Sequence, residues 1–269
     1  VSCDVRGSGV EGRCRRAVAP VAASSSVAVR CHAVRSMVEN ASKLGSAWAR
    51  MIPIYPTRVL SDRQVASALG NRLLISLETA DQCTSCHQPA LFQHGDVCEV
   101  RRRGPGQTRH NAFRDLLARQ AKAAGSTAVT ECVADAPEAN PLLRGDILVT
   151  GAAAPDGIVG VVVISFTAPT RLRNITRSAR VERLPEEPAT SWTKRQLRRM
   201  TAIREDEKRR KYAGAFTAPL TPVVFTAGGF PSNRSKEWLK RLRVFAQGKL
   251  ASAFDLSVAI VRARAASLL

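Results

Sequence analysis

One uninterrupted run of apolar residues constrains this chain most: Ile158-Val159-Gly160-Val161-Val162-Val163-Ile164. A strand that is apolar at every position is typical of one buried on both faces of its sheet. The fold therefore needs a sheet with other elements packed on each side, and Pro155-Asp156-Gly157 provides a turn before the run. A chain of 269 residues is long enough to bury such a core.

Shorter patterns predict the remaining elements and indicate an α/β fold. Other strands are expected at 128–132, 146–150 and 223–226, the last closed by Gly228-Gly229. Helical spacing predicts helices that begin near Ser61-Asp62, cover about 111–123, begin near Ser235, and cover about 254–268. Residues 171–212 contain 14 Lys and Arg against 6 acidic residues, which indicates a long surface helix or loop arm.

Helix faces are also predicted by these patterns. The apolar positions expected to point inward are Val65, Leu69, Leu73 and Leu74; Phe113, Leu116, Leu117 and Ala121; and Trp238, Leu239, Leu242 and Phe245.

Four of the chain's seven Cys and four His residues have the spacing of a small metal site. Cys83, Cys86, His94 and Cys98 form a C-x2-C-x7-H-x3-C pattern. Zn²⁺ binds four such ligands in a tetrahedron, and a site with every position filled is structural. His87 is an alternative ligand, and the opposing interpretation is cysteines that bind nothing. The pattern predicts a structural zinc ion and a reducing compartment.

The charge predicts a polyanionic partner, because 41 Lys and Arg against 22 Asp and Glu give a formal net charge of +19. An ordinary basic surface is the alternative. Arginine pairs bidentately with phosphate oxygens, and an aromatic content of 5% argues against a base-stacking platform. Trp192 is expected to pack, with stacking on a base as the alternative. The candidate nucleic-acid contacts are Arg101, Arg102, Arg103, Arg109, Arg114, Arg195, Arg198, Arg199, Lys208, Arg209, Arg210 and Lys211.

The N-terminal region divides the chain into three expected parts. Residues 1–36 are rich in Ala, Val, Ser and Arg and contain two acids, Asp4 and Glu11, which is typical of a mitochondrial targeting segment or of a disordered basic arm. We expect a basic arm over 1–60, a helix and zinc module over 61–108, and an α/β domain over 109–269. No run has the roughly 20 apolar residues of a membrane span.

The order of these motifs resembles the C-terminal region of site-specific non-LTR retrotransposon proteins over roughly residues 60–265. In that family a zinc knuckle precedes a restriction-endonuclease-like domain of PD-(D/E)XK type, which nicks DNA. The resemblance implies a mixed sheet flanked by helices. The matching residues are Cys83, Cys86, His94, Cys98, Arg109-His110-Asn111, Glu131, Arg144-Gly145-Asp146, Lys208 to Tyr212, and Gly228-Gly229.

The resemblance also implies a catalytic site that this chain has partly lost. Asp146 matches the family's first metal ligand, although Gly145 replaces the usual proline, and Glu131, Lys208 and Lys211 match accessory positions. The second acidic ligand is expected near 158–160, where the chain has Ile158, Val159 and Gly160. Asp156 replaces it only after a shift of register. One carboxylate is a poor site for Mg²⁺, so we expect these residues to be vestigial.

Three functions remain open from the sequence. The first is a catalytically inactive, retroelement-derived subunit that binds RNA in a large ribonucleoprotein, with a mitochondrial ribosome as the favoured host. The second is an active, metal-dependent DNA endonuclease in which Asp156 restores the pair. The third is a scaffold in another organellar complex. No small-molecule substrate is expected, and nuclear or cytoplasmic locations are alternatives to the mitochondrion.

Overall fold

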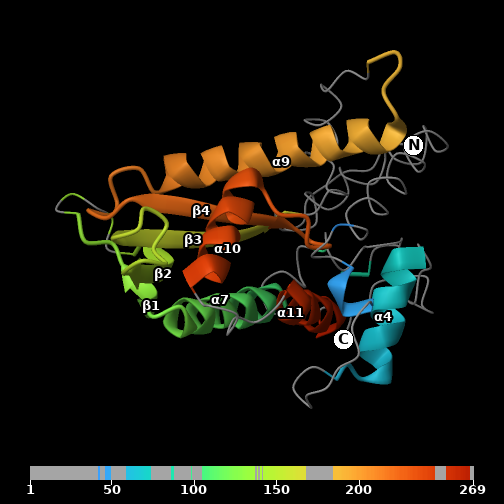
Figure 1. The fold of residues 1–269 in the computed structure, drawn as a ribbon, viewed down its shortest axis with the longest axis horizontal. Coiled ribbons are helices and arrows are strands. Elements are labelled where there is room, and N and C mark those ends of the chain that lie inside the picture. Colours follow the sequence, from blue (N-terminus) through green and yellow to red (C-terminus); the bar gives the residue numbers. More distant parts are fainter. Residues whose placement is uncertain are drawn as a thin grey trace, which may run out of the picture.

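Four strands form one mixed sheet in the order β1-β2-β3-β4 (Figure 1). β1 (Thr127–Val133) and β2 (Arg144–Thr150) are antiparallel, β2 and β3 (Val159–Thr167) are antiparallel, and β3 and β4 (Leu220–Thr226) are parallel. The computed structural model describes residues 42, 46–49, 59–73, 86–87, 98, 105–136, 138, 140, 142–167, 184–245 and 253–266.

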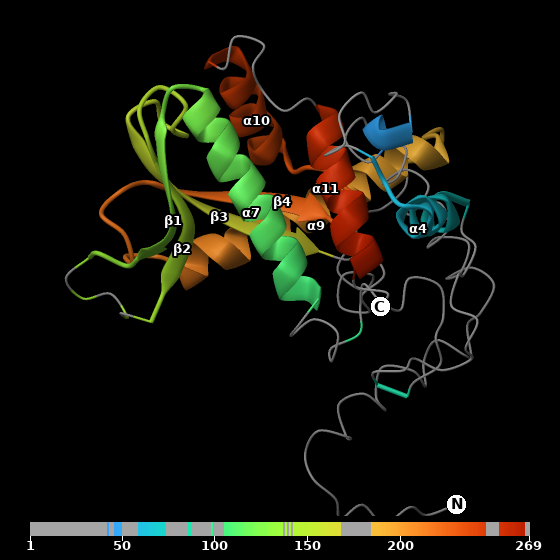
Figure 2. The ribbon, with the colours of Figure 1, turned by 90° about the horizontal axis from the view of Figure 1, so that it is seen from below.

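Helices cover both faces of this sheet, as the β-branched run predicts (Figures 1 and 2). One face carries α7 (Pro105–Ala123), α10 (Asn233–Phe245) and α11 (Ala253–Ala266), and the other carries α9 (Ala189–Lys211). The short η1 (Ala47–Ala49) and α4 (Asp62–Leu73) pack against α11, where the Trp48 N–H donates to Ser257 Oγ at 3.1 Å.

The main core lies between the sheet and α7. Phe113 and Leu117 of α7 are almost fully buried against Ile147, Val162 and Ile164. Rings of Phe113, Phe166 and Phe225 meet with centroids 4.8 to 5.9 Å apart. Trp238 and Leu242 of α10 complete this core, as their helical spacing predicts. Leu239 is partly buried there.

A long surface helix or a loop arm was expected for the basic segment 171–212, and the structure has the helix, although one side of it is buried. The described part of the segment forms α9. The side of α9 that faces the sheet and Phe230 buries Leu197, Met200 and Thr201. Only a narrow stripe of α9 is apolar, and the rest of its circumference is charged. The average composition of the segment therefore did not predict that one side of the helix packs into the core.

Two serine-capped helix starts were predicted, and one of them is displaced. Ser61 Oγ accepts the Gln64 N–H while Gln64 Oε1 accepts the Ser61 N–H, a reciprocal capping box that confirms the start of α4. In α10 the cap is Ser232, whose Oγ accepts the Ser235 N–H at 3.1 Å. Ser235 instead bonds both the N–H and the carbonyl of Val224 on β4.

Within the described residues, no helix is both long enough and apolar enough to cross a membrane.

Candidate functional site around Asp146

Asp146 lies on β2 at the point where the β2–β3 ladder stops. The last paired residues are Ile147 and Val162, and beyond them the Asp146 carboxylate takes the place of a backbone partner. Its Oδ2 accepts the N–H of Ile164 at 2.5 Å, and its Oδ1 lies 2.8 Å from His110 Nε2 of α7. Both carboxylate oxygens are therefore engaged by the protein itself.

A second acid, Glu131, faces Asp146 from the neighbouring strand. The β1–β2 register runs through Thr130 and Ile147 on one side and Cys132 and Gly145 on the other, which places Glu131 opposite Asp146. Glu131 has φ of 58°, an uncommon conformation for this residue type, so this pair makes no ladder bonds. The side chain of Glu131 pairs with Arg114.

Two side chains of α7, one helical turn apart, thus contact both acids. His110 contacts Asp146 and Arg114 contacts Glu131, and residues four apart lie on the same helix face. Arg114 also pairs with Asp115 at 2.8 Å and is 11% exposed. The two acids of the site are accordingly paired with protein side chains of α7.

The structure gives a steric reason for glycine at position 145. A Cβ at this position would lie 2.4 Å from Val161 Cγ1 and 2.6 Å from Cys132 Sγ. Both distances are shorter than any ordinary contact. Only glycine fits where β1, β2 and β3 approach each other beside Asp146.

Basic side chains of α9 approach the carboxylate from the other face of the sheet. Arg204 Nε donates to Ser165 Oγ on β3 at 2.8 Å and its Nη1 pairs with Glu207 at 2.8 Å. One turn further on, burial lowers the pKa of Lys208 to about 8, and the charges of Arg204 and Lys211 lower it further while Asp146 opposes them. This is a half-buried cation held near a carboxylate that already has other partners.

Tyr212 closes the same face of the site. The Nζ atoms of Lys208 and Lys211 lie 5.6 and 5.1 Å from its ring centroid. Burial raises the pKa of Tyr212, and the charge of Asp146 adds to this effect. Arg204, Lys208 and Tyr212 follow one another at intervals of four, so a single face of α9 supplies all three side chains.

The predicted position of the second acid is wrong. Val159 and Gly160 pair with Thr150 and Val149, at the far end of β2 from Asp146. Asp156 is also remote from Asp146, because it lies in the turn that joins the far end of β2 to β3. Its Oδ1 accepts the N–H groups of Ile158 and Val159 and so closes that turn. A shift of register at Asp156 therefore does not restore the pair.

The β3 residue that contacts Asp146 is Ile164, through its backbone N–H, and Ser165 follows it in the chain. Ser165 is buried, and its hydroxyl is bonded to Arg204. An antiparallel partner of a residue near the start of β2 must come from the later part of β3, so the expected spacing was too short.

These donors do not fit a magnesium ion. Mg²⁺ prefers oxygen ligands in an octahedron and is usually held by one or two carboxylates with free oxygens. Here both oxygens of Asp146 are engaged, Glu131 is paired with Arg114, and Lys208 adds a positive charge. In the described part of the chain no three His, Cys, Asp or Glu side chains gather closely enough to hold a metal ion.

The predicted basic contacts divide into engaged and exposed side chains. Arg109 stacks on the Phe166 ring at 5.0 Å, Arg114 is buried in its ion pairs, and Arg195 pairs with Glu187. These three are less suited to phosphate than predicted. Arg198, Arg199, Arg210 and Lys211 are exposed on α9, while Arg209 is partly exposed with Asp206 at 3.9 Å. Arg101, Arg102 and Arg103 lie outside the described residues.

The predicted zinc site falls largely outside the described residues as well. Cys83 and His94 are not among them. Cys86 is half-buried and Cys98 is buried. The zinc site stays a prediction.

Three participants in the site were not anticipated from the sequence. His110 was noted only as part of a motif, and Arg204 and Ser165 were not singled out. The spacing of four that joins Arg204, Lys208 and Tyr212 is a usable signal, because it places them on one helix face. Ser165 gives no such signal, since its role depends on where β2 and β3 separate.

Comparisons with known proteins add no relative: no protein-family model matches the chain, and no curated protein matches it. The fold and site define a mixed α/β domain in which a carboxylate is enclosed by basic side chains.

Proposed function

We propose that this protein binds RNA through its phosphate backbone as a non-catalytic, endonuclease-like subunit of a large ribonucleoprotein. The observation that carries the proposal is the state of Asp146. Both of its oxygens are bonded within the protein, one to His110 and the other to the backbone N–H of Ile164. A phosphodiester hydrolase of this type needs carboxylates that hold a metal ion.

The fold agrees with the resemblance to the endonuclease-like domain. Asp146 lies on the second strand of a mixed sheet, and Lys208 faces it from the helix that follows the third strand. The side chains that remain at this site are cations, with no carboxylate that is free to hold a metal ion.

Phosphate recognition follows from the exposed face of α9 and the total charge. Arg198, Arg199, Arg210 and Lys211 present guanidinium and ammonium groups to solvent. A net charge of +19 favours association with a polyanion through release of its counterions. The favoured host, a mitochondrial ribosome, follows from the composition of the N-terminal segment and this charge.

A salt titration of the whole chain with a structured RNA tests the proposal. Affinity should fall by about 10³-fold or more between roughly 50 and 200 mM salt if six or more phosphates are contacted. Arg198→Gln combined with Arg199→Gln should weaken binding and flatten the salt dependence. Lys122→Gln, at an exposed site on α7 across the sheet, should change neither. No binding at low salt would contradict the proposal.

The metal-dependent DNA endonuclease remains the second candidate because Glu131 lies opposite Asp146 in the β1–β2 register. For catalysis a metal ion would have to displace both Arg114 and His110 from these carboxylates. A cleavage assay decides between the two candidates.

A further inference from the structure

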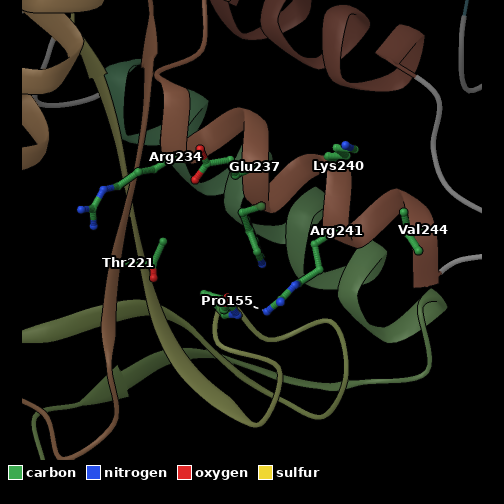
Figure 3. Close-up of a pocket in the computed structure, with 8 residues that line it drawn as sticks. Pro155, Thr221, Arg234, Glu237, Lys240, Arg241 and Val244 are labelled. Carbon is green, nitrogen blue, oxygen red and sulfur yellow. Dashed lines mark hydrogen bonds between the residues drawn. The ribbon is translucent and has the colours of Figure 1, made fainter.

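A hollow of about 610 Å³ lies between α10, the turn after β2 and the edge strand β4. Figure 3 shows Arg241 pointing from α10 toward Pro155, while Arg234, Glu237 and Lys240 lie along the same helix and Thr221 lies on β4. We call it the α10 groove. None of the residues that line it belongs to the Asp146 site.

The α10 groove carries a net positive charge from three cations against one carboxylate, Glu237. Arg241 is fixed in place because its Nη1 donates to the carbonyls of Ala154 at 3.0 Å and Pro155 at 2.6 Å. These bonds use one corner of the guanidinium and neutralise no charge. An immobilised arginine loses little side-chain entropy when it binds an anion.

Lys240 and Arg234 extend this charge along the groove. Lys240 is exposed and has no ion-pair partner among the described residues. Arg234 contacts only one edge of the buried Glu205, with Nε 4.0 Å from Oε2. Asp156, which adjoins Pro155, has an oxygen occupied by two backbone N–H groups. The cations outnumber the acids that face them.

The groove is continuous with the basic face of α9 around the β4 edge. Arg234 of α10 reaches Glu205 of α9, and Arg198 of α9 is close enough to Lys236 of α10 to add to the effect of burial in lowering the pKa of Lys236. Two cations that repel each other across a helix junction are stabilised by an anion between them. A partner with phosphates at regular intervals fits such a row of charges.

We propose that the α10 groove is a second contact surface for the nucleic-acid backbone, with Arg241 and Lys240 binding phosphate. The inference rests on the proposed function and adds to it a path for the strand, from α9 around the β4 edge into the groove. Glu237 faces the same path and should oppose binding. Trp238 is buried and bonded to the Ala153 carbonyl, so the groove reads phosphate rather than bases.

Lys240→Gln and Arg243→Gln form a matched pair that tests this surface. Both residues are exposed on α10, but only Lys240 lines the groove. Binding of a structured RNA to the whole chain is measured over a range of salt concentrations. Lys240→Gln should weaken binding on the order of threefold to tenfold and reduce the log–log salt slope by about 0.7 to 0.9, the loss of one phosphate contact. Arg243→Gln should leave both unchanged.

Two further variants sharpen the result. Glu237→Gln removes the opposing charge and should tighten binding. Arg241→Lys keeps the positive charge but removes the planar guanidinium that can bind two phosphate oxygens at once, so it should weaken binding. An unaltered unfolding temperature shows that the fold of this variant is intact. Equal effects of Lys240→Gln and Arg243→Gln would overturn the α10 groove as a specific surface. If the unaltered chain binds no RNA, it is the proposed function that fails.

Discussion

At the residue scale, the site depends on how completely one carboxylate is used. Asp146 fills a gap in the sheet by accepting the Ile164 N–H, and it holds His110 from the helix above. In a working metal site these oxygens would be directed at an ion. Here they join β2, β3 and α7, so the acid contributes to the fold.

Keeping the positive charge of Lys208 partly buried near Asp146 lowers the stability of the folded protein. Burial lowers the pKa of Lys208 to about 8, below its unfolded value of 10.5. Between these values the unfolded chain binds more protons, so stability rises with pH through this window and the penalty is fully present below it. Lys208→Met removes the penalty.

The free energy of unfolding of Lys208→Met, measured against the unaltered chain at pH 7 and pH 10, checks this. The variant should gain more at pH 7 than at pH 10. Lys122→Met, at an exposed position, controls for the general effect of removing a lysine. A gain from Lys208→Met that is the same at both pH values would contradict the depressed pKa.

At the element scale, β4 is an edge strand whose outer side is closed by the start of α10. The Val224 N–H donates to Ser235 Oγ at 2.7 Å, that hydroxyl donates to the Val224 carbonyl at 3.0 Å, and the Ser232 N–H reaches the same carbonyl. Edge strands of this kind otherwise offer free backbone groups to other chains. The serines also hold α10 and its groove in position.

Ser235→Ala should therefore destabilise the protein by about 1–3 kcal/mol, because it leaves the buried Val224 N–H without a partner. Urea unfolding gives this free energy directly. Ser191→Ala, at an exposed position in α9, should cost little by comparison. Equal small changes in both variants would show that the Ser235 bonds contribute little to the edge.

The elements also show how far sequence patterns lead. The β-branched run predicted β3 and the need for helices on both faces, because apolar periodicity follows directly from burial. The role of α9 was missed, since a narrow buried stripe is hidden in a charged helix. The partner of Asp146 was placed wrongly because strand register is a long-range property: it depends on where β2 and β3 separate, and no local pattern at Ile158 or Ser165 records that.

At the scale of the whole molecule, the proposed RNA partner is tested by the distribution of charge. Basic side chains lie on α9, at the Asp146 site and along the α10 groove, and of the acids near them Glu207 is paired and Glu205 is buried. A scaffold of this kind neutralises phosphates at several places at once. Its binding is expected to be strong at low salt and insensitive to base sequence.

The most direct test is cleavage measured while the nucleic acid is bound. The whole chain at saturating concentration is incubated with supercoiled DNA, or with end-labelled structured RNA, in Mg²⁺ or Mn²⁺, and binding and strand integrity are measured on the same samples. We predict bound and intact nucleic acid, with the same binding by Asp146→Asn if that variant folds. Metal-dependent nicking that Asp146→Asn abolishes, without loss of binding, would contradict the account.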